Sequence, residues 1–457
     1  VAITQRVFMN ARGNWSGTYG FIIAAIGSAV GLGNIWRFPY LAGMNGGGAF
    51  VLLYLVMAVF VGVSLLVAEQ ALGRYTGTNA YGAFRSIHPK FAFVGTIAIL
   101  ANFLILSFYS MIGGWVIYYL FASIVAPHTL TAEGFQTFST STAVPLLFQF
   151  AFMVLTGFFV WRGISKGIEW GNRIMMPLLF LMLGLIVIRS LTLPGAMEGV
   201  RFFFKTDFSK INASTVISAL GQVFFSMSVG FGIMLTYASY LGKDTPLSRS
   251  SWLVAMSNSL VAVLAGLAIL PAVFSFKMEP EQGPGLLFVV IPEIFRQMSG
   301  GYFFGILFFL LVFFAALTSS ISILEVPVSY LVDEHRLSRR KAVIVASSIT
   351  SVLGIFCTLS MGSTLGWFKI YGMGIFDLLD FISNNLLLPV GGLMLCILVG
   401  YVWKPEKVLA EITLDGKHPF LGKKYWLYLI RYVVPLAIVA ILISGSGILD
   451  IAKSFFE

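Results

Sequence analysis

Charged residues are scarce in this chain of 457 residues: they make up 11% of it, against about 25% in a typical soluble domain. Cysteine is nearly absent as well. The two cysteines, Cys357 and Cys396, lie in apolar stretches, which excludes a disulfide framework and a cysteine-based metal centre. Hydrophobic residues instead make up 58%, and the mean hydropathy is +0.91. This composition predicts an integral membrane protein.

Long stretches without Asp, Glu, Lys or Arg are the main positive signal, because each can hold a membrane span of about 20 residues. They are 91–132, 134–161, 211–242, 250–276 and 342–368. Together with neighbouring apolar segments they predict an all-α integral membrane protein of about eleven transmembrane helices. The expected helices are 15–40, 45–73, 91–125, 143–162, 168–190, 214–241, 249–275, 302–333, 341–360, 374–402 and 427–453. The polar N-terminus and the long, interrupted first apolar run argue against a cleavable signal peptide.

Glycine-rich interruptions occur in two of these helices. Gly27–Gly33 reads Gly-Ser-Ala-Val-Gly-Leu-Gly, and Ser226–Gly232 has the related pattern Ser-Met-Ser-Val-Gly-Phe-Gly. Each glycine costs roughly 1 kcal/mol relative to alanine inside a helix, and an unwound backbone within a bilayer must line a cavity or be buried in protein. Two interrupted spans in corresponding halves indicate the binding site of a transporter. Close helix packing is the alternative role for these glycines.

The helices fall into two halves of five, 15–190 and 214–402, and each half begins with an interrupted helix. Because five is an odd number, the two halves cross the membrane in opposite senses, which predicts an inverted repeat. We expect 1–14 to be a cytoplasmic N-terminal segment, 403–426 a cytoplasmic loop and 427–457 an additional transmembrane helix.

Lysine and arginine are unevenly distributed between the loops. If the N-terminus is cytoplasmic, 20 of the 29 fall on the inner side, as the positive-inside rule requires. The net charge of +10 therefore reflects topology and lipid contact, and we expect no nucleic-acid partner. The sequence predicts a multi-pass protein of the cell (inner or plasma) membrane with its C-terminus outside. Segments 198–212 and 277–300 are expected to be ordered extracellular loops, and 404–425 a polar cytoplasmic connection.

Several motifs carry a specific resemblance. They are Gly31–Tyr40 (Gly-Leu-Gly-Asn-Ile-Trp-Arg-Phe-Pro-Tyr), Asn45–Phe50, Glu69–Tyr75 and Leu317–Ser320. In these motifs the chain resembles the neurotransmitter:sodium symporter family, and in particular its bacterial amino-acid transporters with the leucine-transporter-like fold. The resemblance covers nearly the whole chain. Many members have twelve spans, and the helix missing here lies outside the two expected repeats. A transporter of this kind has no catalytic residues and is not an enzyme.

The resemblance implies an amino-acid substrate between the two interruptions. Its carboxylate would meet the amides of Leu32 and Gly33 at a helix N-terminus and the hydroxyl of Tyr109, which could otherwise be a packing tyrosine. Position 31 is glycine, where amine carriers of the family have an aspartate, so the carboxylate must come with the substrate. The apolar part of the implied site favours aliphatic or aromatic side chains. The implied substrate residues are Ser28, Ala29, Leu32, Gly33, Ile105, Tyr109, Phe225, Ser226, Ser228, Phe231, Ser319 and Ile323.

Two sodium ions are implied by the same resemblance. The first would be bound by Ala29, Asn34, Ser226, Asn258 and the substrate carboxylate. The second would be bound by Gly27, Val30, Ala315, Thr318 and Ser319. The hydroxyls of Thr318–Ser320 could instead bond back to their own helix, and Asn258 could simply bridge two helices.

Gates are implied on either side of the substrate. Arg37 with Asp380, or less favourably Asp377, would close the outer side. The inner gate would consist of Arg12, Trp15, Asp333 and Tyr240, with Ser239 beside them. Charges at helix ends are, however, often merely solvated. Gly167 and Pro177 resemble the cytoplasmic unwinding motif of the fifth span, although Pro177 could simply kink a packed helix.

Glu69 and Glu325 lie well inside expected spans, where ionisable groups are costly unless they are partnered or functional. Chloride-dependent members have an anion site that a serine at position 262 completes, and chloride-independent members often have an acid there. The rest of that site would be Tyr54, Gln222, Ser226 and Asn258. Ala262 fits neither pattern. Because Glu69 could supply the negative charge, we expect no chloride requirement; a structural role for its carboxyl group is the alternative.

The sequence thus predicts a sodium-coupled symporter of hydrophobic L-amino acids that works by alternating access. Its expected partners are the amino acid, Na⁺ and the lipid bilayer. Symport of other small amino acids or of amines is the nearest alternative. An ion channel would need a continuous polar pore, and a sensor without transport would normally carry a soluble signalling domain; the sequence shows neither pattern.

Overall fold

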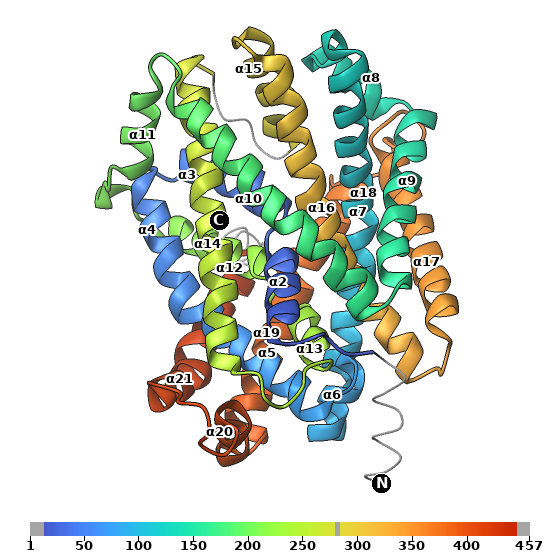
Figure 1. Ribbon diagram of the computed structural model, residues 1–457, viewed down its shortest axis with the longest axis vertical. Coiled ribbons are helices and arrows are strands. Elements are labelled where there is room, and N and C mark those ends of the chain that lie inside the picture. Colours follow the sequence, from blue (N-terminus) through green and yellow to red (C-terminus); the bar gives the residue numbers. More distant parts are fainter. Residues whose placement is uncertain (1–12, 279–283, 446–457) are drawn as a thin grey trace, which may run out of the picture.

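The computed structural model describes residues 13–278 and 284–445, which form a bundle of long helices (Figure 1). In the described residues nine helices are long and apolar enough to cross a membrane, and one bent pair adds a tenth span. A shorter interrupted pair, α12 (Ala213–Ser226) and α13 (Ile233–Ala238), accounts for the remaining expected segment. The prediction of an all-α membrane protein is confirmed.

The uninterrupted spans lie within a few residues of the expected ones, although the end of the last one, 446–453, lies outside the described residues. Their main elements are α4 (Gly48–Met57), α5 (Val63–Thr76), α7 (Ala92–Val125), α9 (Ala143–Trp161), α10 (Trp170–Leu191), α14 (Leu247–Ser275), α16 (Gly301–Asp333), α17 (Arg339–Ser360), α18 (Ile375–Phe381), α19 (Leu388–Ile397), α21 (Lys423–Tyr428) and α22 (Val434–Gly445). Several spans contain a short wider helical turn, such as Ala58–Gly62 between α4 and α5. The α10 span begins in this way, at Ile164.

The first broken span consists of α2 (Thr18–Ala29), a wide turn at Gly33–Arg37 and α3 (Phe38–Met44), with a bend of 52°. The helix ends because Val30 takes an extended conformation, with φ −78° and ψ 103°. The break is therefore shorter than the expected Gly27–Gly33, since Gly27 is still helical. Gly27 faces α10, and its missing side chain permits close packing there.

The second break separates α12 from α13 and extends over residues 227–232. Ser228, Gly230 and Gly232 all have positive φ values, of 54°, 84° and 70°. Glycine accepts this left-handed conformation at no steric cost, whereas a serine pays for it. The chain is thus not helical where the glycine pattern of Ser226–Gly232 predicted an interruption.

A group of helices packs around α7, which contacts α9, α16 and α17. Gln149 of α9 bridges two of them: its Nε2 donates to Ser110 Oγ (3.0 Å), and its Oε1 accepts from Thr358 Oγ1 (2.5 Å). Gly114 lets α7 approach this point closely, because a Cβ atom there would lie 2.5 Å from the Gln149 backbone nitrogen. Small residues and buried amides are typical of helix contacts in membranes.

Short helices that the sequence did not predict connect the spans. They are α6 (Ala80–Ile87), α8 (Ala132–Thr140), α11 (Ala196–Phe204), α15 (Ile291–Gln297) and α20 (Pro405–Thr413). The last three fall in segments expected to be loops or a polar connection. Asn79 and Thr131 cap α6 and α8 by accepting hydrogen bonds from the amides of Gly82 and Gly134, as N-cap residues commonly do. A search for apolar stretches of about 20 residues, the length of a membrane span, does not detect helices this short.

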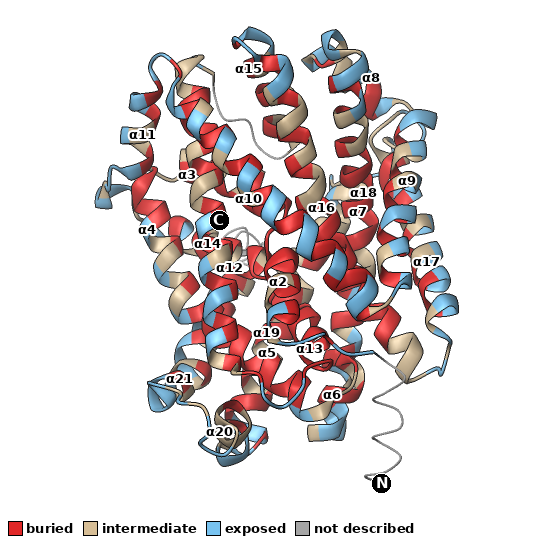
Figure 2. Ribbon diagram, in the orientation of Figure 1, coloured by how far each residue is buried: buried red, intermediate tan, exposed pale blue. Residues whose placement is uncertain are grey.

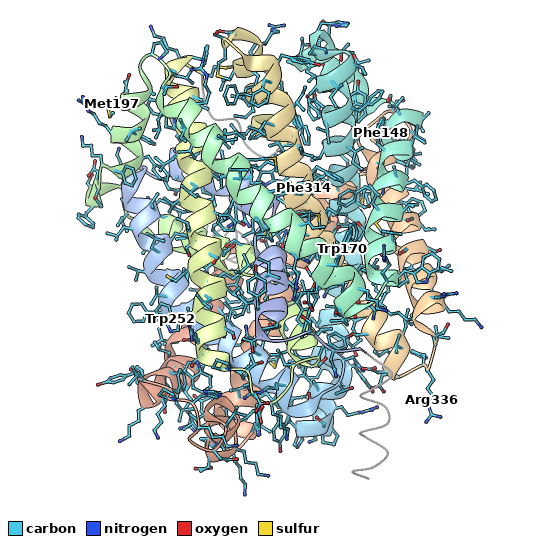
Figure 3. The ribbon with its side chains drawn as sticks, in the orientation of Figure 1. Phe148, Trp170, Met197, Trp252, Phe314 and Arg336 are labelled. Atoms are coloured by element: carbon cyan, nitrogen blue, oxygen red, sulfur yellow. The ribbon has the colours of Figure 1, made fainter. Side chains whose placement is uncertain are left out.

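Burial is highest where the helices meet, and exposed residues lie on the outside of the bundle (Figure 2). Large side chains such as Trp170, Met197 and Trp252 point outward from it (Figure 3). An apolar outer surface of this kind fits a lipid environment rather than water.

Candidate functional site

The two helix breaks line a common cavity. Every predicted substrate residue lies in its wall. The lining residues are Ser28, Ala29, Gly31, Leu32, Gly33, Asn34, Ile105, Tyr109, Phe225, Ser226, Ser228, Phe231, Ile233, Ser319 and Ile323. Among these, Ile233 was not singled out from the sequence, because it follows the glycine-rich break and resembles an ordinary helix residue.

One end of the cavity is built to receive an anion. The amides at Leu32 and Gly33 begin a helical segment, where the first N–H groups have no partner within the helix. Tyr109 Oη is buried and has no hydrogen-bond partner in the described part of the chain. A Cβ atom on Gly31 would lie 3.5 Å from this oxygen and 2.6 Å from Ser319 Oγ. A carboxylate here would satisfy donors that are otherwise left unpaired.

The predicted first sodium ligands converge in the structure. Asn258 Oδ1 accepts from Asn34 Nδ2 (2.9 Å), and the same oxygen faces the carbonyl oxygens of Ala29 (2.9 Å) and Ser226 (3.0 Å). Asn258 Oδ1 and the two carbonyl oxygens repel one another at these distances unless a cation lies among them. The repulsion is also removed if the Asn258 amide is rotated by 180°, so that its NH2 group donates to the two carbonyls. Oxygen donors of this kind suit a hard cation. The residues present therefore fit a sodium ion.

The predicted second set also comes together, with its hydroxyls bonded to the backbone. Ser319 Oγ donates to the carbonyl oxygens of Ser28 (3.2 Å) and Val30 (3.3 Å). Thr318 Oγ1 donates within its own helix to Phe314 O (2.9 Å) and Ala315 O (3.2 Å). The helix back-bonding considered for these hydroxyls is thus present, and it gathers their oxygens beside the first break.

Side chains from neighbouring helices hold the unwound backbone in place. Gln222 Nε2 donates to Gly33 O (2.9 Å), Ser228 Oγ to Ser28 O (3.2 Å) and Asn102 Nδ2 to Phe231 O (2.8 Å), while Glu69 Oε1 accepts from the Gly230 amide (2.7 Å). The sequence singled out Glu69 because it is charged. Asn102 gave no such signal, since a single amide in an apolar helix has many structural uses.

The predicted outer gate residues lie near one another without forming an ion pair. The Arg37 guanidinium lies over the ring of Phe225, 5.1 Å from its centroid. Asp380 accepts a hydrogen bond from Asn384 Nδ2 (2.7 Å) one turn away on its own helix. Among the described residues, no ion pair within 4.0 Å joins Arg37 and Asp380.

On the inner side, Trp15 closes the bundle. Its Nε1 donates to Tyr237 O (2.8 Å), and its ring packs edge-on against Tyr237 and Tyr240. Tyr240 Oη in turn donates to Glu325 (2.7 Å), whose carboxylate is fully buried and paired with Arg339 (2.5 Å). Arg12, the other predicted member, lies outside the described residues. Glu325, unassigned from the sequence, thus belongs to this inner layer.

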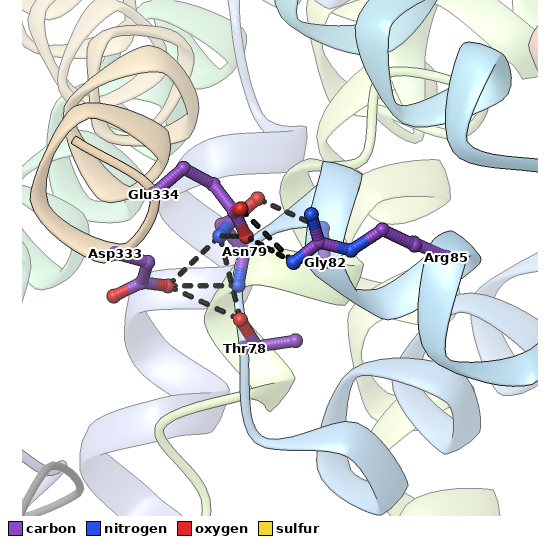
Figure 4. Close-up of polar contacts among 6 residues, drawn as sticks. All are labelled: Thr78, Asn79, Gly82, Arg85, Asp333 and Glu334. Atoms are coloured by element: carbon purple, nitrogen blue, oxygen red, sulfur yellow. Dashed lines mark hydrogen bonds and ion pairs between the residues drawn. The ribbon is translucent and has the colours of Figure 1, made fainter. Parts of the chain in front are cut away.

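Asp333 joins the end of α16 to the start of α6 (Figure 4). Its Oδ2 accepts from the backbone nitrogen (2.9 Å) and Nδ2 (3.1 Å) of Asn79. The neighbouring Glu334 pairs with Arg85 at 3.0 Å. These contacts hold the end of α16 and the start of α6 together.

Gly167 and Pro177, the expected unwinding motif, lie in helical backbone. Gly167 is in the wide turn Ile164–Glu169, and Pro177 is inside α10. The turn begins after Gly163, whose φ is +89°. In this structure the fifth span is therefore wound throughout the motif.

Three of the residues that correspond to the anion site of chloride-dependent members lie together. Tyr54 Oη and Ser226 Oγ are 3.2 Å apart, and Asn258 Nδ2 donates to both (3.1 and 3.2 Å). Ala262 is fully buried and offers no polar group.

Comparisons with known proteins agree on one family. The model of the sodium:neurotransmitter symporter family matches residues 12–144 and 130–452. An uncharacterized sodium-dependent transporter of Bacillus subtilis (strain 168), YhdH, is 40% identical over 446 residues, covering 95% of this chain and 98% of the relative. The sodium-dependent serotonin transporter of Drosophila melanogaster is 30% identical over 431 residues, covering 82% of this chain and 68% of the relative.

The fold has a solved counterpart. The crystal structure of MhsT in complex with L-phenylalanine superposes with a TM-score of 0.87 at 41% identity. The match covers 95% of this chain and all of that one (100%).

Proposed function

The chain belongs to the sodium:neurotransmitter symporter family, and we propose that it carries hydrophobic L-amino acids together with two sodium ions. It is a multi-pass membrane protein of a sodium-dependent transporter family and not an enzyme. The observation that carries the proposal is the cavity between the breaks, where Tyr109 Oη has no hydrogen-bond partner in the described residues and a helical segment begins at Leu32 and Gly33. An amino acid brings a carboxylate that suits this end of the cavity.

The walls of the cavity support an apolar side chain. Ile105, Phe231, Ile233 and Ile323 lie at its sides, and all four are at least 95% buried. Burial of a large apolar side chain against such a surface is worth roughly 1.5–3 kcal/mol. A charged side chain would lose its hydration there without gaining a partner. The complex of the related MhsT contains L-phenylalanine, which fits this class.

Both sodium ions would be bound by oxygens beside the first break. The first ion would lie among Ala29, Ser226 and Asn258, and the substrate carboxylate would complete its ligands. The second would lie near Val30, Ala315, Thr318 and Ser319, with the carbonyl of Gly27. Because the first ion and the substrate share a carboxylate, each would raise the affinity for the other by the same factor.

An amine substrate is the main alternative, since a relative is a serotonin transporter. In this family the carboxylate that amines lack would come from an aspartate at position 31. Gly31 provides none, and a Cβ atom there would lie 2.6 Å from Ser319 Oγ. Real Cβ atoms do not approach a neighbour so closely, which favours substrates that carry their own carboxylate.

Transport would proceed by alternating access between the two five-helix halves, 15–190 and 214–402. The inner layer of Trp15, Tyr240 and Glu325 would have to separate for release, and Arg37 with Asp380 would close the outer side. We place the protein in the cell membrane with its N-terminus cytoplasmic and its C-terminus outside. Chloride would not be required, because Glu69 already supplies a buried negative charge near the second break.

Uptake by purified protein in liposomes tests the proposal. Radiolabelled L-phenylalanine should accumulate when sodium is outside and should stop when potassium replaces all sodium, with no proton gradient. Replacing chloride by gluconate should leave uptake unchanged. Uptake that continues at the same rate in potassium would contradict sodium coupling.

A further inference from the structure

Helix α2 lies against the fifth span (Ile164–Leu191) at two glycines. A Cβ atom on Gly27 would overlap Asn172 Oδ1 and lie 3.3 Å from Met176 Sδ. A Cβ atom on Gly20 would overlap the carboxylate of Glu169. Where α2 has no side chain, polar side chains of the fifth span therefore fill the space.

Asn172 differs from Glu169 in that its side-chain oxygen accepts no hydrogen bond from the described residues. The residue is fully buried, and its Nδ2 donates to Ile168 O (2.8 Å) in its own helix. Its Oδ1 has no hydrogen-bond partner in the described residues. A buried acceptor without a partner destabilises the fold and calls for an explanation. It points at Gly27, whose carbonyl is a proposed ligand of the second sodium ion.

Glu169 continues this line of oxygens toward the cytoplasmic end of the span. Its carboxylate accepts from the backbone nitrogen of Ser16 (2.8 Å) and from Ser16 Oγ. It also pairs with Arg173 (2.6 Å), whose side chain is 46% exposed. The side-chain oxygens of Asn172 and Glu169 thus lie along the contact between α2 and the fifth span. They lead from Gly27 of the second sodium set to the ion pair with the partly exposed Arg173.

We propose that Asn172 Oδ1 is a transient ligand for the second sodium ion on its way to the cytoplasm, with the Glu169 carboxylate as the next oxygen. The inference rests on the proposed function, since it needs a sodium ion near Gly27. An ion that leaves a site within the membrane must replace its oxygen ligands one at a time, because an ion without ligands is costly there. An unpartnered amide oxygen beside the site lowers that barrier, and its lack of charge prevents it from trapping the ion.

The test compares net uptake with equilibrium binding in Asn172→Leu, which keeps the size of the side chain and removes its oxygen. We expect the turnover rate of sodium-driven L-phenylalanine uptake to fall about tenfold, as loss of one ligand in a transition state predicts. The sodium dependence of phenylalanine binding to detergent-purified protein should change by less than about twofold, because the ion in its resting site does not use Asn172. Met176→Leu, at the same helix contact, is the matched control and should transport like the wild type.

Asn172→Asp provides a second measurement that packing alone does not influence. A carboxylate at position 172 should bind sodium that enters from the cytoplasmic side more tightly. Sodium inside the liposomes should therefore inhibit uptake at a lower concentration than in the wild type. The inference is wrong if Asn172→Leu turns over at the wild-type rate, or if its turnover and its sodium-dependent binding fall together, as expected of a structural residue. Wild-type binding that ignores sodium would overturn the proposed function itself and this inference with it.

Discussion

The two helix breaks differ in length and in what their residues contribute to the cavity. The first occupies residues 30–32 and is held by Ser319, and its backbone lies beside both proposed sodium sets. The second occupies 227–232, contains three residues with positive φ and is held by Asn102 and Glu69. Phe231 in this break and Ile233, the first residue of α13, contribute to the apolar wall. We propose that the first break mainly binds the sodium ions and the substrate carboxylate, and that the second mainly determines which substrate side chain is accepted.

Of the changes considered at the first helix break, Gly31→Asp should impair function most severely. Its Cβ atom would lie 2.6 Å from Ser319 Oγ, and its carboxylate would repel that of the substrate, a like-charge contact worth several kcal/mol. We expect L-phenylalanine uptake to fall by more than about a hundredfold, at 1.4 kcal/mol per factor of ten. Gly184→Ala is the matched control, because no atom lies within 4 Å of the added methyl group. Binding of phenylalanine by Gly31→Asp at wild-type affinity would mean that position 31 does not face the carboxylate.

The double variant Thr318→Val and Ser319→Ala should also act through the first region. It removes two hydroxyl oxygens from the proposed second sodium set, and a hard cation has no substitute for them. We expect about tenfold more sodium to be needed for half-maximal phenylalanine binding. Ser347→Ala removes a hydroxyl that has no partner among the described residues and should have no effect. A wild-type sodium dependence in the double variant would make these hydroxyls purely structural.

Asn102→Leu tests the second region. It removes the donor that holds Phe231 O, at 2.8 Å, so the apolar wall should become less well defined. We expect the KM for L-phenylalanine to rise about threefold to tenfold, while the sodium concentration for half-maximal uptake stays the same. Gln is a useful comparison at this position, since it retains a donor. If sodium dependence shifts and KM does not, the proposed division between the breaks is wrong.

Ile233→Ala should give the smallest effect. The change enlarges the cavity by three carbon atoms at a position that lines it, so large substrates gain room and small ones lose contact. We expect the ratio of uptake efficiencies for tryptophan and leucine to rise about threefold. Ile269→Ala, in a buried position outside this cavity, controls for general loss of packing. An unchanged ratio would remove Ile233 from the set that determines selectivity.

The sequence predicted the spans and both interruptions because hydropathy and glycine content act locally. The substrate residues implied by the family motif around Gly31–Tyr40 line one cavity, and their roles stay a prediction. The sequence overestimated the first break, because Gly27 serves close packing against Asn172 rather than unwinding. It missed Asn102, Asn172 and Ile233, whose roles depend on which distant backbone atom they face. No pattern within a single helix carries that information.

The most direct measurement of the central claim is the effect of substrate on sodium affinity. Sodium binding to the purified protein would be titrated alone, with L-tryptophan and with tryptamine, which lacks only the carboxylate. If the substrate carboxylate completes the first sodium set, tryptophan should raise the affinity for sodium about tenfold, within the usual range of coupling between sites, and tryptamine should leave it unchanged. An equal increase with tryptamine would contradict the claim that the missing negative charge comes with the substrate.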